Sequence, residues 1–481
     1  MALALAAALP LLAATAGARA QAPTPCRLDG LEHAALCGQV QRPLDPARPL
    51  GPQIQVHYAL LPALARNPQP DPVVFFAGGP GQSAIELAGP IHAMLARLSN
   101  RRDILLIDQR GTGLSAPLAC PAGRPTAPLS EQLDPARVPA RMQACRSALQ
   151  KLPWGDLRFY ATWIASQDTE AVRRAIGAAR LNLVGGSYGT RAALDYLRQY
   201  PQHVRRVVLD GVAPPGMVLP ASFSTDNQAA LDGLLAACEG DADCHRAYPT
   251  LRADWRALLA SLPLEASVAQ PLTGQVQRLT FTRDMVLGLV RGPLYAPWLA
   301  AGLPLALHEA AQGRFEPLVG LSAATEGGPG KLYEGMHFSV VCSEDAPRLD
   351  QAGDLPGADF GQAFAQQYRQ VCADWPRGPV PADFYRLPVA RVPALLLAGG
   401  ADPATPPRHA AEVARALGPM ARQVTVAQAG HGLLAIPCLR DLVYRFIDAA
   451  SDARALRLDA GCAARLPRPP AFVPVHDGDR P

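Results

Sequence analysis

The sequence predicts an α/β fold: a mostly parallel sheet with helices on both faces, interrupted by a largely helical insertion. First, short apolar runs typical of buried strands alternate with amphipathic stretches typical of helices. Second, this alternation stops near residue 216 and resumes near residue 389. The predicted strands are Val73–Phe76, Asp103–Ile107, Leu181–Val184, Val204–Leu209, Val392–Ala398 and Arg422–Val426.

These changes of pattern divide the chain of 481 residues into four parts. Residues 1–20 are predicted to be a signal peptide, and residues 21–216 the first part of the core. Residues 217–388 are predicted to form a cap inserted into that core, and residues 389–481 its second part with a C-terminal tail. Extended segments between residues 38 and 60 are expected to form an antiparallel hairpin ahead of the parallel strands.

The N-terminus predicts export. Met1–Ala16 is almost wholly apolar but too short to span a bilayer, and Ala18-Arg19-Ala20 supplies the small residues that a signal peptidase reads. A buried N-terminal helix is the alternative. We therefore expect cleavage after Ala20 and a periplasmic or extracellular protein without a membrane span.

Cysteine usage agrees with export, because all ten cysteines follow the predicted cleavage site and an even number in an exported chain indicates disulfides. Sequence alone does not fix the connectivity. Pairing of nearest neighbours would give Cys26–Cys37, Cys120–Cys145, Cys238–Cys244, Cys342–Cys372 and Cys438–Cys462.

Some classes of function find no support. No Cys or His spacing is typical of a zinc site, so we expect no metal and no cofactor. The net charge is only +4, without a basic stripe and interleaved aromatic residues, which argues against nucleic-acid binding. We expect a monomer.

Ser187 is the predicted nucleophile. It lies in a Gly-x-Ser-x-Gly motif, Gly185 to Gly189, between the strand Leu181–Val184 and a predicted helix from Arg191 to Tyr200. A strand that reverses sharply into a helix leaves no room for side chains on either flank of the turning residue, which is held in a strained conformation. The serine hydroxyl is thereby presented at a helix N-terminus, where backbone N–H groups face a developing anion. An ordinary glycine-rich turn is the alternative.

Two further loops follow strands at the same edge of the predicted sheet. Ala77-Gly78-Gly79-Pro80-Gly81 follows Val73–Phe76, and its glycines would let the backbone approach a substrate. We expect the N–H groups of Gly79 and Tyr188 to form an oxyanion hole. In the second loop, Arg110 is a candidate substrate contact, but tying loops together through ion pairs is the favoured reading.

A base and an acid follow the two last strands. Asp402 comes just after Val392–Ala398, and His431 lies between glycines after Arg422–Val426. His431 would take the proton from Ser187, while Asp402 would fix the imidazole tautomer and stabilise the imidazolium. The order Ser187, Asp402, His431 is that of α/β-hydrolases, and none of the other nine histidines follows a comparable strand.

These motifs resemble those of secreted tripeptidyl aminopeptidases related to proline iminopeptidase. The resemblance rests on Gly78-Gly79-Pro80-Gly81, Asp108-Gln109-Arg110-Gly111-Thr112-Gly113, Gly185-Gly186-Ser187-Tyr188-Gly189-Thr190, Asp402-Pro403-Ala404-Thr405-Pro406 and Gly430-His431-Gly432. It implies a capped α/β-hydrolase fold and serine exopeptidase activity at peptide N-termini, without a metal. One departure is Ala77, where proline iminopeptidases typically have a histidine that could brace the loop.

The resemblance also implies that an acidic group of the cap holds the substrate ammonium. Val340-Val341-Cys342-Ser343-Glu344-Asp345 resembles that segment. Glu344, and with less support Asp345, are the candidates, because a partly desolvated ammonium needs a carboxylate partner. Most Glu-Asp pairs, however, are solvated surface.

Two function classes stay open at this point. The first is an aminopeptidase that releases a short N-terminal piece of a peptide. The second is a carboxylesterase or lipase-like hydrolase on the same scaffold, since fold and triad do not choose the acyl substrate. A non-catalytic role would require a broken triad, and this one is intact in sequence.

Overall fold

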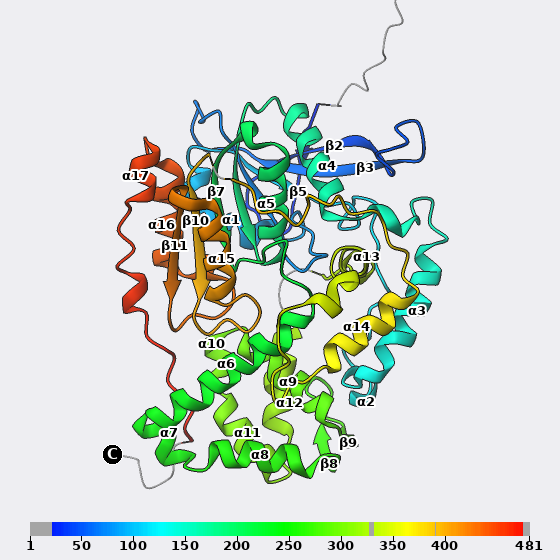
Figure 1. Cartoon of the computed structure of the whole chain (residues 1–481), viewed down its shortest axis with the longest axis vertical. Coiled ribbons are helices and arrows are strands. Elements are labelled where there is room, and N and C mark those ends of the chain that lie inside the picture. Colours follow the sequence, from blue (N-terminus) through cyan, green and yellow to red (C-terminus); the bar gives the residue numbers. More distant parts are fainter. Residues whose placement is uncertain (1–21, 327–330, 390, 475–481) are drawn as a thin grey trace, which may run out of the picture.

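The computed structural model describes residues 22–326, 331–389 and 391–474 (Figure 1). The predicted signal peptide therefore lies outside the described residues. Within the described ranges, no helix is long and apolar enough to cross a membrane.

The core is a nine-stranded sheet with the order β1-β2-β3-β5-β4-β6-β7-β10-β11. Its first strands pair antiparallel, β1 with β2, β2 with β3 and β3 with β5. From β5 to β11 every pairing is parallel. The strands are β1 Thr24–Cys26, β2 Ala35–Pro43, β3 Gln53–Leu61, β4 Val73–Phe76, β5 Ile104–Ile107, β6 Leu181–Gly186, β7 Val204–Asp210, β10 Ala394–Gly399 and β11 Ala421–Val426. The predicted hairpin and mostly parallel sheet are confirmed.

Helices cover both faces of the sheet because its central strands are apolar on both sides. In β10, Leu396 packs into one apolar cluster, whereas Leu395 and Leu397 pack into another on the opposite face. The first face is covered by α4 Thr162–Ala175, α5 Tyr188–Gln199 and α15 Pro407–Leu417, the second by α1 Ala88–Ser99 and α16 Pro437–Asp448. Three further helices outside the insertion are α2 Leu129–Gln132, α3 Val138–Leu149 and α17 Asp452–Leu456.

The segment between β7 and β10 is largely helical and lies beyond the carboxyl ends of β10 and β11 (Figure 1). Its helices are α6 Ala221–Gly240, α7 Ala242–Ala247, α8 Leu251–Ser261, α9 Arg283–Leu294, α10 Pro297–Ala300, α11 Leu303–Ala311, α12 Glu316–Glu326, α13 Glu334–Glu344 and α14 Ala363–Ala373. It also contains an antiparallel hairpin, β8 Leu264–Ala269 and β9 Val276–Phe281, which the sequence pattern did not reveal.

The cysteines pair as nearest neighbours along the chain, as the simplest connectivity predicts: Cys26–Cys37, Cys120–Cys145, Cys238–Cys244, Cys342–Cys372 and Cys438–Cys462. No cysteine is left free. Such complete pairing is typical of chains that fold in an oxidising compartment.

Candidate active site

Ser187 lies at the sharp turn between β6 and α5, with φ 56° and ψ −127°, a conformation that non-glycine residues rarely adopt. The flanking glycines are required by packing. A Cβ on Gly185 would come within 2.5 Å of the Gly189 carbonyl oxygen, and one on Gly189 would overlap the carbonyl of Phe76. The Ser187 N–H donates to the Asp210 carbonyl oxygen over 2.8 Å, which ties the turn to the end of β7.

The glycine loop after β4 packs directly against this turn. A Cβ on Gly78 would lie 3.2 Å from the Ser187 Cβ, a tight contact that glycine avoids. Gly79 follows with φ 108°. Tyr188 opens α5, and its buried hydroxyl interacts with Thr162 Oγ1 at 2.6 Å and accepts a hydrogen bond from Gln109 Nε2 at 2.9 Å. Both predicted oxyanion-hole residues therefore belong to backbone segments next to Ser187.

Asp402 and His431 are in contact at the carboxyl ends of β10 and β11. His431 Nδ1 lies 2.8 Å from Asp402 Oδ2. The other Asp402 contacts fix the carboxylate, which accepts hydrogen bonds from the N–H groups of Ala404 and Thr405 and from the Thr405 hydroxyl. The imidazole ring lies over Gly211, where a Cβ would come within 3.1 Å of His431 Cε1. The Asp210 carbonyl oxygen accepts from the Ser187 N–H, and the next residue, Gly211, packs against the His431 ring. The segment Asp210–Gly211 therefore contacts both Ser187 and His431.

The electrostatics of this pair favour an ionised acid beside a basic imidazole. Burial alone would raise the pKa of Asp402, but His431 and the N–H donors of Thr405 and Ala404 hold this pKa below its usual value. Burial alone would lower the pKa of His431, but the charge and hydrogen bond of Asp402 raise it above 6.5, with a further contribution from Asp210.

Asp210 is a site residue that the sequence reasoning missed. Its buried carboxylate accepts hydrogen bonds from the N–H groups of Leu433 and Leu434, both at 2.9 Å, and so fixes the turn that follows His431. Burial raises the pKa of Asp210. One signal could have revealed it: Asp210 ends a buried strand at the same sheet edge as Ser187, in the same way that Asp402 follows β10.

Glu344 and Asp345 end α13 and are fully buried, not on the surface. Asp345 accepts two hydrogen bonds from Arg191 Nη1, at 3.0 and 3.1 Å, and Glu344 Oε2 lies 3.6 Å from the same atom. The Glu344 carboxylate also accepts from the N–H and hydroxyl of Thr162. Burial raises the pKa of Glu344 to about 8, with Arg191 opposing the rise.

The Arg191 cluster, which we define as Arg191, Glu344 and Asp345, connects the insertion to the helix that begins after Ser187. Arg191 lies in α5, one helical turn after Ser187. Thr162 Oγ1 contacts both Glu344 and the Tyr188 hydroxyl. Two carboxylates thus share a single guanidinium and are linked through Thr162 to Tyr188, the residue after Ser187.

Arg110 is fully buried, and its guanidinium is held by hydrogen bonds to other parts of the protein. Its guanidinium forms a bidentate ion pair with Asp168, at 2.6 and 2.8 Å, and donates to the carbonyl oxygens of Leu44 and Phe159. These contacts fit the favoured interpretation, in which Arg110 ties loops together, and a contact with substrate would require breaking them.

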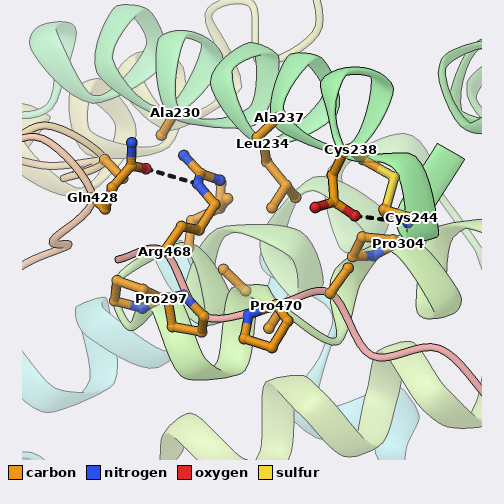
Figure 2. Close-up of a pocket in the computed structure, with 17 residues that line it drawn as sticks. Ala230, Leu234, Ala237, Cys238, Cys244, Pro297, Pro304, Gln428, Arg468 and Pro470 are labelled. Carbon is orange, nitrogen blue, oxygen red and sulfur yellow. Dashed lines mark hydrogen bonds between the residues drawn. A yellow bond between two sulfur atoms is a disulfide. The ribbon is translucent and has the colours of Figure 1, made fainter. Parts of the chain in front are cut away.

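Two pockets are lined in part by the C-terminal residues 466–471. A cavity of about 150 Å³ is enclosed by α6, α7, α10 and residues 468–471, and Arg468 donates within it to Gln428 Oε1 at 2.9 Å (Figure 2). Ser187, Asp402 and His431 do not line it. A groove of about 280 Å³ borders His431 and is lined by Trp298, Ile436 and Pro467, among others. In the described part of the chain, no group of three or more His, Cys, Asp and Glu side chains could hold a metal ion.

Comparison with known proteins identifies the class. A sequence model of the alpha/beta hydrolase fold matches residues 71–263, and a model described as TAP-like protein matches residues 357–455. Together with the sheet order and the serine turn, these matches define the chain as an α/β hydrolase.

Several peptidases are similar to this chain in sequence. The serine protease Hip1 of Mycobacterium tuberculosis is 25% identical over 82% of each chain. The tripeptidyl aminopeptidase of Streptomyces coelicolor is 25% identical over 90% of this chain and 84% of its own. The proline iminopeptidase of Neisseria meningitidis is 29% identical over 30% of this chain and 34% of its own. The chain is thus a serine hydrolase that is similar to tripeptidyl aminopeptidases and proline iminopeptidases, and the resemblance that its motifs predicted is confirmed.

Proposed function

We propose that this enzyme is an exported serine exopeptidase that cleaves peptide bonds near a free N-terminus through an acyl-enzyme. The proposal rests on one observation: the Ser187 turn and His431 both contact the segment Asp210–Gly211. His431 is in turn bound to the buried carboxylate of Asp402. The names of the relatives support peptide over ester substrates.

In the proposed mechanism, Ser187 Oγ attacks the scissile carbonyl carbon while His431 takes the hydroxyl proton. Since Nδ1 of His431 is bound to Asp402, Nε2 is the nitrogen free to act as the base. The N–H groups of Gly79 and Tyr188 would stabilise the oxyanion. Protonated His431 then donates to the leaving amine, and a water molecule activated by neutral His431 releases the acyl group.

The Arg191 cluster supports recognition of an amine. Arg191 supplies one positive charge for the two carboxylates of Glu344 and Asp345, and all three side chains are buried. The ammonium of a peptide N-terminus would supply a second cation and so favour the ionised form of Glu344, whose pKa burial raises to about 8. Because Glu344 is buried, the ammonium would have to displace its hydrogen bond to Thr162 Oγ1.

Glu344→Gln tests this proposal. We expect KM for a free-amine tripeptide p-nitroanilide to rise about 10-fold or more, because a hydrogen bond to a charged group contributes about 1.5–3 kcal/mol. For the same anilide with an acetylated N-terminus, Glu344→Gln should have the KM and kcat of the unmodified enzyme. Glu334→Gln is the matched control, since Glu334 lies on the same helix but pairs with Arg141 at the surface. Equal effects of Glu344→Gln on both anilides would contradict amine recognition.

A p-nitrophenyl ester assay separates the two function classes. A peptidase of this kind prefers the free amine by a large factor, whereas an esterase is indifferent to it. If the ester is turned over faster than any free-amine anilide and N-acetylation changes nothing, the esterase alternative is correct.

We infer that the protein acts in the periplasm or outside the cell. The inference is supported by the complete pairing of the ten cysteines and by the predicted signal peptide. N-terminal sequencing of the protein recovered from the producing cells should begin at Gln21. A protein that keeps Met1 and accumulates with reduced cysteines in the cytoplasm would contradict export.

A further inference from the structure

Helix α13 belongs to the insertion in sequence, but it packs into the catalytic core. Every residue from Gly335 to Glu344 is buried. The Met336 side chain packs against Gly111 in the loop after β5, and the Gly335 N–H donates to the Leu118 carbonyl at 3.0 Å. The helix is also tied to α14 by the disulfide between Cys342 and Cys372. Figure 1 shows it nearer the sheet than α8 and α11.

The N-terminal end of α13 holds the glycine loop. The Tyr333 N–H donates to the Gly81 carbonyl at 2.9 Å, and a Cβ on Gly79 would come within 3.1 Å of Leu332 Cδ1. His337 Nδ1 lies 3.1 Å from the Pro80 carbonyl oxygen. Three consecutive residues of the loop, Gly79, Pro80 and Gly81, thus contact the start of one helix.

The tautomer of His337 follows from its two partners. A carbonyl oxygen only accepts, so Nδ1 carries the proton that is donated to Pro80. Nε2 is then an acceptor, and the Tyr368 hydroxyl donates a hydrogen bond to it over 2.8 Å. Burial lowers the pKa of His337 to about 4, which keeps the ring neutral at any pH at which the proposed base His431 is active.

The C-terminal end of α13 holds the other side of the site. Asp345 binds Arg191 of α5, and Glu344 binds Thr162, which in turn contacts the Tyr188 hydroxyl. The two ends of one buried helix therefore contact the two backbone segments from which the oxyanion hole is proposed to be built. Ala77 lacks the side chain that could brace the glycine loop from within, and His337 braces it from the insertion.

We propose that α13 fixes the distance between the two halves of the oxyanion hole, a role that we call the strut. His337 positions the glycine-loop half through its hydrogen bond to the Pro80 carbonyl oxygen. The inference rests on the proposed function, in which Gly79 and Tyr188 supply the oxyanion donors. His337 is a positioning residue, since it acts through the loop and not on substrate.

A pair of near-isosteric variants tests the strut. The amide nitrogen of Asn can take the place of His Nδ1, so His337→Asn keeps a donor for Pro80 and loses the contact to Tyr368. The amide of Gln reaches instead toward the Nε2 position, so His337→Gln keeps the Tyr368 contact and loses the donor to Pro80. Losing a whole oxyanion donor costs about 10²–10³ in kcat, and misplacing one costs less. We expect kcat of His337→Gln to fall about 10–100-fold with KM within about threefold, and His337→Asn to retain most of kcat.

A second readout separates positioning from general damage. The affinity for a peptide boronate, which forms a tetrahedral adduct with Ser187, should weaken in His337→Gln in step with kcat/KM, while inhibition by the product tripeptide stays unchanged. Equal loss in both variants, equal weakening of both inhibitors, or unchanged activity in His337→Gln would each overturn the strut. If Ser187→Ala keeps activity, the proposed function itself fails. If Ser187→Ala is inactive and His337→Gln behaves as unmodified enzyme, only the strut fails.

Discussion

Ser187→Ala is expected to fold normally and to lose kcat by about 10⁵–10⁶-fold, the scale on which removal of a triad nucleophile acts. The proposed chemistry has no other nucleophile, because the Ser187 turn is the point at which the glycine loop, Asp210 and the first N–H groups of α5 converge. Alanine keeps the Cβ and the backbone contacts, so the melting temperature should stay within about 1–2 °C. The measurements are kcat on the free-amine anilide and a thermal melt.

Ser187→Gly adds a test of the backbone strain. Glycine adopts a positive φ without steric cost, although it also raises the entropy of the unfolded chain. This variant should be as inactive as Ser187→Ala but more stable by about 1 kcal/mol, which a denaturant titration measures. Ser147→Ala, at an exposed position of α3, is the control for handling and should be fully active. Residual activity of Ser187→Ala above about a thousandth of the unmodified enzyme would contradict the assignment.

The parts of the site that could be predicted from sequence are those whose signal is local. The strand and turn around Ser187, and the strand that ends before Asp402, each form a pattern of about ten residues that can be recognised without knowing the rest of the fold. The parallel sheet then explains why such loops meet, because the carboxyl ends of parallel strands share one edge. The pairing of Asp402 with His431 could be predicted in this way although 29 residues separate them.

The parts that could not be predicted depend on long-range pairing. Arg191 and Asp345 lie 154 residues apart, and neither segment carries a local pattern that points to the other. Most Glu-Asp pairs are solvated surface, but this pair is buried because Arg191 pairs with Asp345 and Thr162 donates two hydrogen bonds to Glu344. His337 lies in a helix whose residues are buried on all sides, so α13 has no amphipathic period that could reveal which residues face the glycine loop.

Smaller discrepancies in the insertion have local causes. The sequence pattern of residues 297–312 is typical of one amphipathic helix, but the structure ends α10 at Ala300 and begins α11 at Leu303. Gly302 lies at the break, where a Cβ would come within 3.0–3.1 Å of the Leu321 side chain, and Pro304 occupies the first turn of α11. The hairpin of β8 and β9 was missed although β8 alternates, with Leu264, Ala266 and Val268 on its more buried side and the polar Glu265 and Ser267 between them.

Asp402→Asn is the second change with a large expected effect, a fall in kcat of about 10⁴-fold with the fold retained. Asn can keep the hydrogen bonds from the N–H groups of Ala404 and Thr405 through its oxygen. Its amide would then face His431 Nδ1 as a donor, so the imidazole would carry its proton on Nε2 and could not accept one from Ser187. Thr405→Val is the control, because it keeps the Asp402 carboxylate and removes only the Thr405 hydroxyl, which donates to Asp402 and lies 3.2 Å from His431 Nδ1, and it should cost a few-fold.

The pH dependence of kcat/KM tests the same contact independently of its magnitude. The base must be neutral, so activity falls as the pH falls through the pKa of His431, which Asp402 and Asp210 hold above 6.5. In Asp402→Asn the imidazolium loses its main stabilising charge, and the midpoint of the residual activity should move to lower pH. A profile between pH 5 and pH 9 measures the shift. An unchanged midpoint would show that Asp402 does not set the pKa of His431. The acid of the triad would then have to be Asp210, the other buried carboxylate that raises the pKa of His431.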